Sequence, residues 1–442
     1  MVLEKQTERF MAPSVRSRQT GNALACLTCT SFLIQFFNRV IGSYAPYRLF
    51  ILLALAIMFG LVLSTGYVRV PVTAELPLLW IPMLIMVTLH VAAGGLSISH
   101  LMDLLTYMTG VLFVFSAGSD SAIFRKAFRI ILFFSLLYAV SVWIQVLLPG
   151  VYRLYLNLLP ADTVLNIMKY RSESGQLTGF STNPGFTAGH IVAGIIAFFS
   201  LAESERRRPV LRWCMVLFLL SALLLNGKRA HLMIVVFACL LIYMLYHAGE
   251  KRFIALNILI LGAGIMIPVL FFFSDSLSSV PALGRISQML VGLVHGEDVS
   301  NGRSKLYAYA LYQFFEHPVF GMGWGRFRTS IIGTVTLQTE LDTHNIYLQL
   351  LCETGITGFL TVIVPMASFL IRSISNLLEA GRKKETLLTT RLFALYAAGY
   401  QLFFVLYGFT GNPLYDYNYA IMYFVSCAMT AAISAEMRKV TI

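Results

Sequence analysis

Charged residues are scarce in this sequence. Asp, Glu, Lys and Arg make up 12% of it, whereas soluble globular proteins carry about 25%. Hydrophobic residues account for 57%, and the mean hydropathy is +0.74. These values exclude an ordinary soluble domain and predict an all-α, polytopic membrane protein. The net charge of +12 would suit a nucleic-acid partner, but the positions of Lys and Arg favour membrane orientation and no nucleic acid.

Cysteine is also infrequent. The six cysteines all fall within apolar stretches, at positions 26, 29, 214, 239, 352 and 427. None lies in a long polar loop, so we expect no disulfide framework. Cys26 and Cys29 have the spacing of a metal site, but their apolar surroundings favour simple packing within a helix.

Twelve apolar stretches are candidates for crossing a bilayer, which takes about 20 residues. They are 21–37, 49–67, 77–96, 101–117, 128–149, 183–202, 211–226, 231–248, 253–273, 345–371, 391–410 and 418–435. The first and the seventh are short. Residues 1–20 are polar and basic, so we expect a cytoplasmic tail there. A single transmembrane domain is expected over residues 21–442.

The Lys and Arg residues orient these spans. With the N-terminus inside, 21 of the 33 lie in cytoplasmic segments. The short loops on the other side hold only Arg39, Arg48, Lys228 and Arg229. The remaining eight lie in two longer loops, where charge has little influence on orientation. We therefore expect both termini in the cytoplasm and extracytoplasmic loops at 150–182 and 274–344.

The longer of these loops has room for additional structure. Its segment RSKLYAYALYQFFEHP (303–318) has apolar residues at helical spacing, which predicts an amphipathic helix on the outer surface. The stretch GMGWG (321–325) lacks the preceding strand and the spacing of a nucleotide-binding loop. We expect a tight turn there, with Trp324 at the membrane interface.

Two pairs of basic residues are expected at the outer ends of helices. Lys228 and Arg229 occupy a short turn against the charge bias, and Arg303 and Lys305 begin the amphipathic segment. One interpretation is that these side chains extend toward lipid phosphates. The other is a fixed anion site, because a guanidinium matches phosphate oxygens and a helix N-terminus supplies free N–H groups.

The stretch LDTHN (341–345) precedes a long apolar run. Asn345 is expected to cap the following helix, and Asp342 suits a position near its N-terminus. His344 could either be a polar residue at the helix end or act as a general base near neutral pH. Glu340 and Asp342, alone or with His344, could hold a metal, although two carboxylates alone rarely hold a divalent ion. We expect no metal there.

Glu353 lies inside the same apolar run, nine residues after His344. That separation is about 2.5 helical turns, so the two side chains point to nearly opposite faces. We expect Glu353 to bond a neighbouring helix, with Gly355 and Gly358 allowing close packing.

Three segments together resemble the O-antigen ligase and O-antigen polymerase superfamily of bacterial membrane glycosyltransferases. They are Arg229 after a span, GRSKLYAYALYQFFEHPVFGMGWG (302–325) and HNIYLQLLCETGITG (344–358), and the resemblance extends over residues 175–372. It implies a GT-C-like helical membrane fold. It also implies transfer of a glycan from an undecaprenyl diphosphate carrier, with inversion and without metal, cofactor or nucleotide sugar.

By matched positions, the resemblance implies that Arg229 and Arg303 hold the diphosphate and that His344 activates the acceptor hydroxyl. Lys228 is expected to bind the diphosphate as well. Supporting roles are expected for Lys305, Asp342 and Asn345. Many members have Ser-Arg where this chain has Lys228 and Arg229. We associate the Lys-Arg form with polymerases, so a polymerase is slightly preferred over a ligase.

The implied partners are an undecaprenyl diphosphate-linked oligosaccharide donor, a glycan or lipid acceptor and membrane lipid. The implied location is the bacterial cytoplasmic (inner) membrane, with the active site on the extracytoplasmic face. Two other functions stay open. A transporter or flippase would need ionisable residues near the bilayer midplane, for which His90, Asp103 and His190 are candidates. A structural scaffold would not depend on Arg229 or His344.

Overall fold

The computed structural model describes residues 80–94 and 121–441. Within the second range there are gaps at 206–207, 298, 301, 336–340 and 383–386, and only scattered positions between 248 and 279. A few positions between 21 and 33 are also described. The predicted spans 49–67 and 101–117 lie outside these residues, as do Asp103 and Glu340.

All elements in the described part of the chain are helices, which confirms the all-α prediction there. In chain order they are α5 (Trp80–Gly94), a 3-10 turn (Ser121–Phe124), α7 (Arg125–Leu147), α8 (Pro149–Leu156), α9 (Ala161–Ser174), α10 (Pro184–Ser204), α11 (Pro209–Asn226), α12 (Arg229–Tyr246), α15 (Pro281–Val294), α16 (Arg303–Glu316), α17 (Phe327–Ser330), α18 (Ile346–Arg382), α19 (Leu388–Tyr407) and α20 (Tyr417–Thr441).

Six helical segments are long and apolar enough to cross a membrane: Ser121–Leu147, Pro184–Ser204, Pro209–Asn226, Arg229–Tyr246, Ile346–Arg382 and Asn418–Arg438. Each corresponds to one of the twelve predicted spans. Helix α19 forms where 391–410 was predicted, but it is not among the six. Helix α5 has 15 residues, fewer than the predicted span 77–96. The predicted total of twelve is therefore not confirmed.

Helix α10, together with α20, is one of the two most deeply buried of the six long apolar helices. It begins at Asn183, whose side-chain oxygen accepts a 2.7 Å hydrogen bond from the N–H of Gly185, as an N-cap does. Of its apolar window 72% is buried inside the protein, against 28% for α11 and α12. A Cβ on Gly194 would lie 2.3 Å from that of Ser135 in α7, so glycine lets the two helices approach closely. Helices α11 and α12 are less buried, and among the described residues each has exposed apolar side chains, such as Leu217 and Val236.

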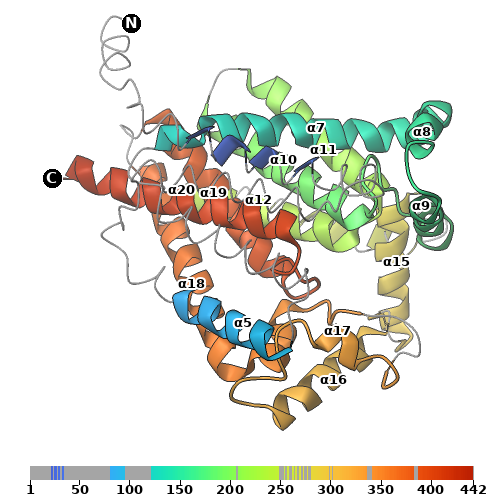
Figure 1. Ribbon diagram of the computed structural model, residues 1–442. Coiled ribbons are helices and arrows are strands. Elements are labelled where there is room, and N and C mark those ends of the chain that lie inside the picture. The colour runs from blue at the N-terminus through green and yellow to red at the C-terminus, as the bar shows by residue number, and fades with distance from the viewer. Residues whose placement is uncertain are drawn as a thin grey trace, which may run out of the picture.

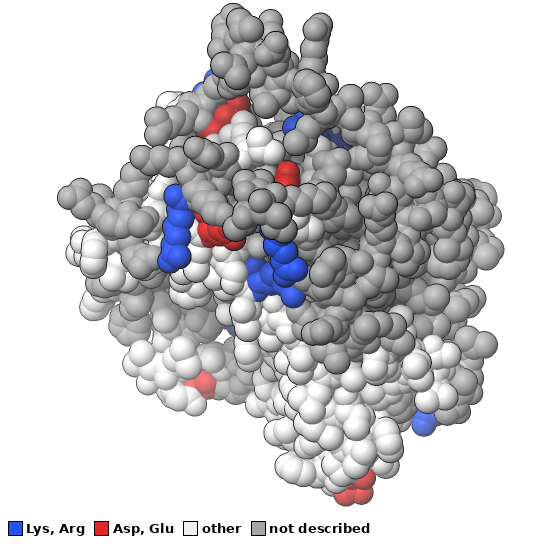
Figure 2. Space-filling view, turned by 90° about the vertical axis from the view of Figure 1, so that its left-hand side faces the viewer, with Lys and Arg blue, Asp and Glu red and all other residues white. Residues whose placement is uncertain are grey.

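Figure 1 shows α7 running across the view from the side where the C-terminus lies to the opposite side, where α8, α9 and α15 gather, while α20 runs from the middle of the view toward the C-terminus. Figure 2 looks onto the C-terminal end, where Lys and Arg side chains lie near the middle of the face and the lower lobe is largely uncharged. Helix α15 contacts both α11 and α12. The loops at the end opposite the C-terminus are thus packed against the bundle.

The predicted amphipathic helix is confirmed as α16, whose buried residues are Leu306 and Ala310. The loop 274–344 also contains α15 and the short α17, and the loop 150–182 contains α8 and α9, none of which was predicted. These four helices have little apolar length, so the span pattern that located the membrane helices did not detect them.

Candidate functional site

The turn between α11 and α12 is fixed from two sides. The side-chain amide of Asn226, at the end of α11, donates to the carbonyl oxygens of Leu177 at 2.6 Å and Pro184 at 3.1 Å. These bonds tie the turn to the start of α10. Lys228 and Arg229 follow directly, so both cations stand on a rigid support.

Arg229 and Arg285 join this turn to α15. Nη1 of Arg229 donates to the carbonyl oxygen of Arg285 at 3.0 Å, and Nη2 donates to that of Val299 at 3.3 Å. In the other direction, Nη1 of Arg285 lies 3.4 Å from the carbonyl oxygen of Gly227. Burial, together with the charges of Arg229 and Arg303, lowers the pKa of Arg285. The two guanidinium groups thus lie close together in spite of their like charge.

Arg303 approaches from a third helix. It is the first residue of α16, and its Nη1 donates to the carbonyl oxygen of Thr410, just after α19, at 3.1 Å. Its charge also affects Lys228 and His344, as described below. Arg303 therefore lies between the α11–α12 turn and the segment that precedes α18.

Lys228 differs from the arginines in that its side chain makes no hydrogen bond among the described residues. Its Nζ lies 4.0 Å from the point where a Cβ on Gly185 would stand, which places it beside the start of α10. Burial, with the charges of Arg285 and Arg303, lowers its pKa to about 8, while Asp416 acts in the opposite direction. A partly buried ammonium group of this kind is stabilised by a nearby anion.

These four side chains form the cationic cluster: Lys228, Arg229, Arg285 and Arg303. The described part of the chain contains four ion pairs, and all of them involve other residues. Each guanidinium of the cluster bonds only to backbone carbonyl oxygens in this part of the chain. Planar N–H donors that no carboxylate neutralises are suited to an oxyanion such as a phosphate.

His344 faces the cluster from the turn before α18. Its φ of 52° is a left-handed conformation, which costs a residue other than glycine about 1 kcal/mol or more. The turn is held by its neighbours: Oγ1 of Thr343 donates to the carbonyl oxygen of Asn345 at 2.7 Å. Oδ1 of Asn345 accepts from the N–H groups of Tyr347 and Leu348, at 3.0 and 3.2 Å. This confirms Asn345 as the predicted N-cap.

The imidazole of His344 is neutral at neutral pH. Burial, with the charges of Arg303 and Lys228, lowers its pKa to about 4, while Asp342 acts in the opposite direction. Its ring nitrogens have no hydrogen-bond partner among the described residues. A neutral imidazole has a free lone pair, so it can accept a proton from a hydroxyl placed beside the cluster.

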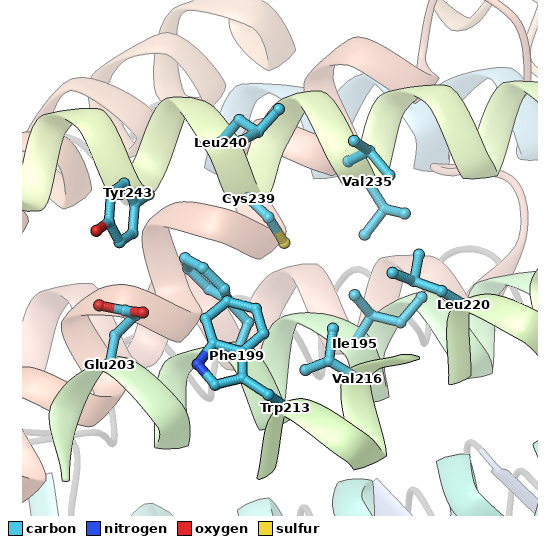
Figure 3. A pocket seen from close by; sticks show the side chains of 11 residues that line it. Ile195, Phe199, Glu203, Trp213, Val216, Leu220, Val235, Cys239, Leu240 and Tyr243 are labelled. Atoms are coloured by element: carbon cyan, nitrogen blue, oxygen red, sulfur yellow. The ribbon is translucent and has the colours of Figure 1, made fainter. Parts of the chain in front are cut away.

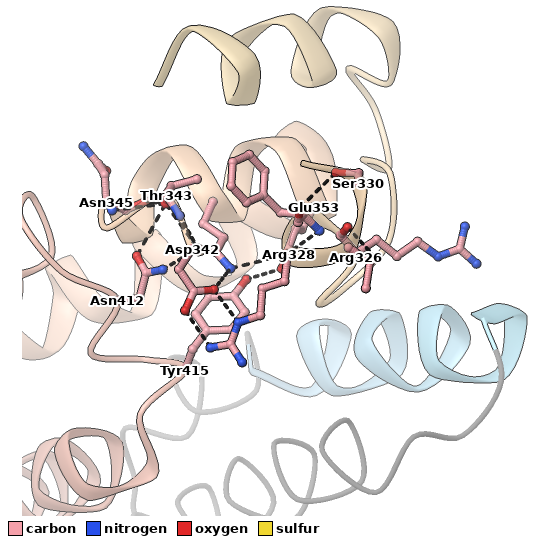
Figure 4. Close-up of polar contacts among 12 residues, drawn as sticks. Arg326, Arg328, Ser330, Asp342, Thr343, Asn345, Glu353, Asn412 and Tyr415 are labelled. Carbon is pink, nitrogen blue, oxygen red and sulfur yellow. Dashed lines mark hydrogen bonds and ion pairs between the residues drawn. The ribbon is translucent and has the colours of Figure 1, made fainter. Parts of the chain in front are cut away.

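Asp342 does not serve as the helix-start residue that the sequence predicted. Both its oxygens bind the guanidinium of Arg328, at 2.6 Å each, as Figure 4 shows. This bidentate pair occupies the Asp342 carboxylate. Asp342 had been considered as a metal ligand together with Glu340, which lies outside the described residues. The pair of Arg328 and Asp342 instead ties α17 to the turn that carries His344.

Gln349 connects this turn to the interior of the protein. Its Oε1 accepts from the N–H of Thr343 at 3.2 Å and from the side-chain amide of Asn412. Its Nε2 donates to Asp342 at 3.1 Å and to Glu353 at 3.3 Å. One buried carboxamide thus coordinates the hydrogen bonds around His344, a role that no sequence motif indicated.

Glu353 is fully buried and, as predicted, bonds a neighbouring helix, the short α17, but it also bonds the segment before α20. The hydroxyl of Tyr415, before α20, donates to its Oε2 at 2.6 Å, and the N–H of Phe327 donates to its Oε1 at 3.2 Å. Trp324 stacks on Tyr415 with ring centroids 4.6 Å apart and is 2% exposed. The prediction of an interfacial Trp324 is therefore wrong.

The GMGWG turn inserts into a break in α18. At Gly355 the backbone leaves the helix, with φ 63° and ψ −171°. The loop replaces the lost bonds: the N–H of Met322 donates to the carbonyl oxygen of Cys352 at 2.9 Å, and the N–H of Ile356 donates to that of Pro318 at 2.9 Å. The predicted tight turn is confirmed, and it holds the broken helix together.

The structure thus brings together Lys228, Arg229, Arg303 and His344, as the sequence suggested. Lys305 lies on the exposed side of α16 and does not join them. Sequence reasoning missed Arg285, although a signal exists in the helical spacing of the apolar residues Ala282 and Ile286 around it. Both are buried in α15. Sequence reasoning also missed Gln349.

These observations define a class: a helical membrane protein with a cationic cluster that forms no ion pair among the described residues and that lies beside a neutral histidine. Residues 213–363 match the family model described as O-antigen ligase, which confirms the resemblance to the O-antigen ligase and polymerase superfamily. The matched range runs from α11 into α18 and contains the whole cluster and His344. It indicates a membrane enzyme of surface-polysaccharide assembly. No curated protein matches the chain.

Proposed function

We propose that this protein is an integral membrane glycosyltransferase that transfers or polymerises glycan units from an undecaprenyl diphosphate carrier. The observation that carries the proposal is the cationic cluster, which forms no ion pair with a carboxylate among the described residues, with a neutral imidazole beside it. The cluster suits a diphosphate, and the imidazole suits a hydroxyl nucleophile. The reaction needs no metal, because guanidinium and ammonium groups provide the positive charge.

The proposed step is a single displacement at the anomeric carbon. The acceptor oxygen forms a bond to that carbon from the face opposite the diphosphate, which inverts its configuration. The bond from the anomeric carbon to the diphosphate oxygen breaks, and its electron pair leaves with the diphosphate. His344 takes the acceptor's proton. Preorganised donors such as Arg229 and Arg303 are each worth about 3 kcal/mol where charge develops, and a general base adds roughly 10²–10⁴ in rate.

Donor binding and base strength are coupled in this arrangement. The charges of Arg303 and Lys228 help to keep the pKa of His344 at about 4. A diphosphate bound to the cluster neutralises those charges and so raises the basicity of the imidazole. His344 is therefore a weak base in the empty site and a stronger one when the donor is bound.

We place this site on the extracytoplasmic face of the bacterial cytoplasmic membrane, because the bias of Lys and Arg puts the α11–α12 turn outside. A polymerase is slightly preferred over a ligase because Lys228 precedes Arg229. The transporter alternative gains no support at His190, whose ring is packed between Phe32 and Tyr138 with centroids 4.5 Å from each. That packing suits a structural residue of the core.

The test is reconstitution in vesicles with an undecaprenyl diphosphate-linked repeat unit. A ladder of longer carrier-linked chains identifies a polymerase, and transfer to a second lipid or glycan acceptor identifies a ligase. Arg229→Ala, Arg303→Ala and His344→Ala should each lower transfer at least a hundredfold, with Arg153→Ala on the exposed side of α8 as the matched control. Full transfer by all three site variants would refute the assignment of the site, and passage of intact donor across the vesicle without transfer would favour a flippase.

A further inference from the structure

An apolar groove runs between α11 and α12 and is floored by α10 (Figure 3). Its volume is about 420 Å³, whereas an apolar cavity of about 150 Å³ already accommodates benzene. The lining residues are Ile195, Phe199, Glu203, Trp213, Val216, Leu220, Val235, Val236, Cys239, Leu240 and Tyr243. No part of the proposed reaction uses them.

The groove has a closed floor and an open side. Ile195 and Val235 are at most 1% exposed and form the floor, whereas Val236 is 39% exposed at the rim. Glu203 and Tyr243 lie at one end of the view in Figure 3, and Leu220 and Val235 lie toward the other. The Glu203 carboxylate binds His247 at 2.6 Å, so the polar end is occupied by an internal pair and the rest is hydrocarbon.

The groove shares a helical face with the cationic cluster. Val236, Leu240 and Tyr243 follow Arg229 by 7, 11 and 14 residues, and these intervals return to the same side of an α-helix. Arg229 thus begins a stripe on α12 whose next members line the groove. At about 1.5 Å per residue, the stripe extends about 21 Å into the span. Helix α15, which contacts α11 and α12, lies at the same outer end.

We propose that this groove holds the hydrocarbon chain of the lipid carrier whose diphosphate lies at the cationic cluster. The inference rests on the proposed function, since it takes the donor to be a lipid-linked diphosphate. A carrier held by its head at Arg229 must send its chain into the bilayer along an adjacent surface. The groove supplies that surface: it is largely apolar, has an exposed rim at Val236, and continues the face of α12 on which Arg229 stands.

The hydrocarbon chain of the carrier gains van der Waals contacts in the groove. It gains no hydrophobic transfer free energy, because bilayer lipid is as apolar as the lining. We therefore expect a moderate preference for long chains. Replacing Leu240 by Trp fills the groove without touching the cluster. Leu217→Trp is the matched control, because Leu217 lies on α11, is 63% exposed and is not a lining residue.

The experiment compares two donors that carry the same glycan diphosphate, one on an undecaprenyl chain and one on a short prenyl chain. L240W should raise KM for the long-chain donor about tenfold and leave KM for the short-chain donor unchanged, while L217W should change neither. An equal change for both donors, or no change for the long-chain donor, would overturn the proposal.

A second measurement needs no turnover. A photoreactive polyprenyl diphosphate without glycan is cross-linked to the wild-type protein in vesicles, and the labelled peptides are mapped. Labels on Val236, Leu240 or Trp213 that undecaprenyl diphosphate displaces and excess phospholipid does not would support the proposal. Labels elsewhere, or equal displacement by phospholipid, would refute it. Groove labelling without any glycan transfer would leave the chain site standing and refute the proposed function alone.

Discussion

Arg229 and Arg285 fix each other's segments through the backbone. Nη1 of Arg229 bonds the carbonyl oxygen of Arg285 at 3.0 Å, and Nη1 of Arg285 lies 3.4 Å from that of Gly227. Two like charges are thereby held close in the absence of a carboxylate partner among the described residues. Such a pair is stabilised by an anion that both guanidinium groups can reach.

Arg285→Gln tests whether the third guanidinium belongs to the anion site. We expect KM for the donor to rise about tenfold and the affinity for inorganic diphosphate to fall by a similar factor, since one charged donor is lost. Calorimetry with inorganic diphosphate and initial-rate kinetics measure the two effects. Arg153→Gln is the control. Unchanged diphosphate binding in Arg285→Gln would restrict the role of Arg285 to holding α15 against the turn.

Lys228→Met tests the cost of the partly buried ammonium group. Burial lowers the pKa of Lys228 to about 8, which shows that its charged form is poorly solvated. The methionine has a similar shape and no charge, so we expect the empty protein to gain about 1 kcal/mol in stability while its diphosphate affinity falls. Thermal unfolding with and without inorganic diphosphate measures both. Lys305→Met, on the exposed side of α16, should change neither, and a loss of stability in Lys228→Met would contradict the prediction.

The pH dependence of transfer follows from the same two groups. His344 acts without a proton, so kcat/KM should fall as the pH drops through about 4. Lys228 acts with its proton, so kcat/KM should fall as the pH rises through about 8. Because kcat reports the donor complex, in which the cluster is neutralised, its acid limb should lie at higher pH than that of kcat/KM. Rates measured from about pH 3, below the pKa of His344, to about pH 9.5, above that of Lys228, with saturating and limiting donor, give both profiles.

One variant assigns the alkaline limb. Lys228→Arg should remove the alkaline limb, because arginine keeps its charge throughout this range. An acid limb at the same pH in kcat and kcat/KM would refute the coupling between the cluster and His344.

The sequence predicted the local features of this molecule well. The six apolar segments, the helix α16 and the cap at Asn345 depend on residues close together in the chain. Contacts between separate segments are not encoded by periodicity. Three examples are the pairs Arg229 with Arg285, Asp342 with Arg328, and Trp324 with Tyr415. Trp324 illustrates the error: an aromatic residue near a membrane span suggested the interface, but the break in α18 gives it a buried place.

Gln349→Met tests whether the network positions His344. Gln349 holds the N–H of Thr343 and bridges Asp342 to Glu353, so its loss should displace the imidazole while the cluster stays intact. We expect kcat to fall about 10²-fold, the order that a small misplacement can cost, with KM for the donor within about twofold of wild type. Steady-state kinetics separate the two constants.

The matched control is Gln401→Met in α19, which removes another fully buried carboxamide, one that bonds Thr430 at 2.9 Å. It should lower the unfolding temperature without changing kcat. Equal loss of kcat in both variants would indicate general destabilisation instead of positioning.

Gly355→Ala tests the break in α18. A Cβ there would lie 2.3 Å from the carbonyl oxygen of Val319 and 2.6 Å from the N atom of Phe320, both backbone atoms that cannot rotate away. The positive φ of 63° adds strain for any residue with a side chain. We expect a loss of about 3 kcal/mol or more in stability, read as a lower unfolding temperature in detergent. Gly150→Ala is the control, because nothing lies within 4 Å of its Cβ position. Equal unfolding temperatures for the two variants would mean that α18 can straighten, and then the GMGWG loop would not be needed to hold the broken helix that carries Gln349 and Glu353.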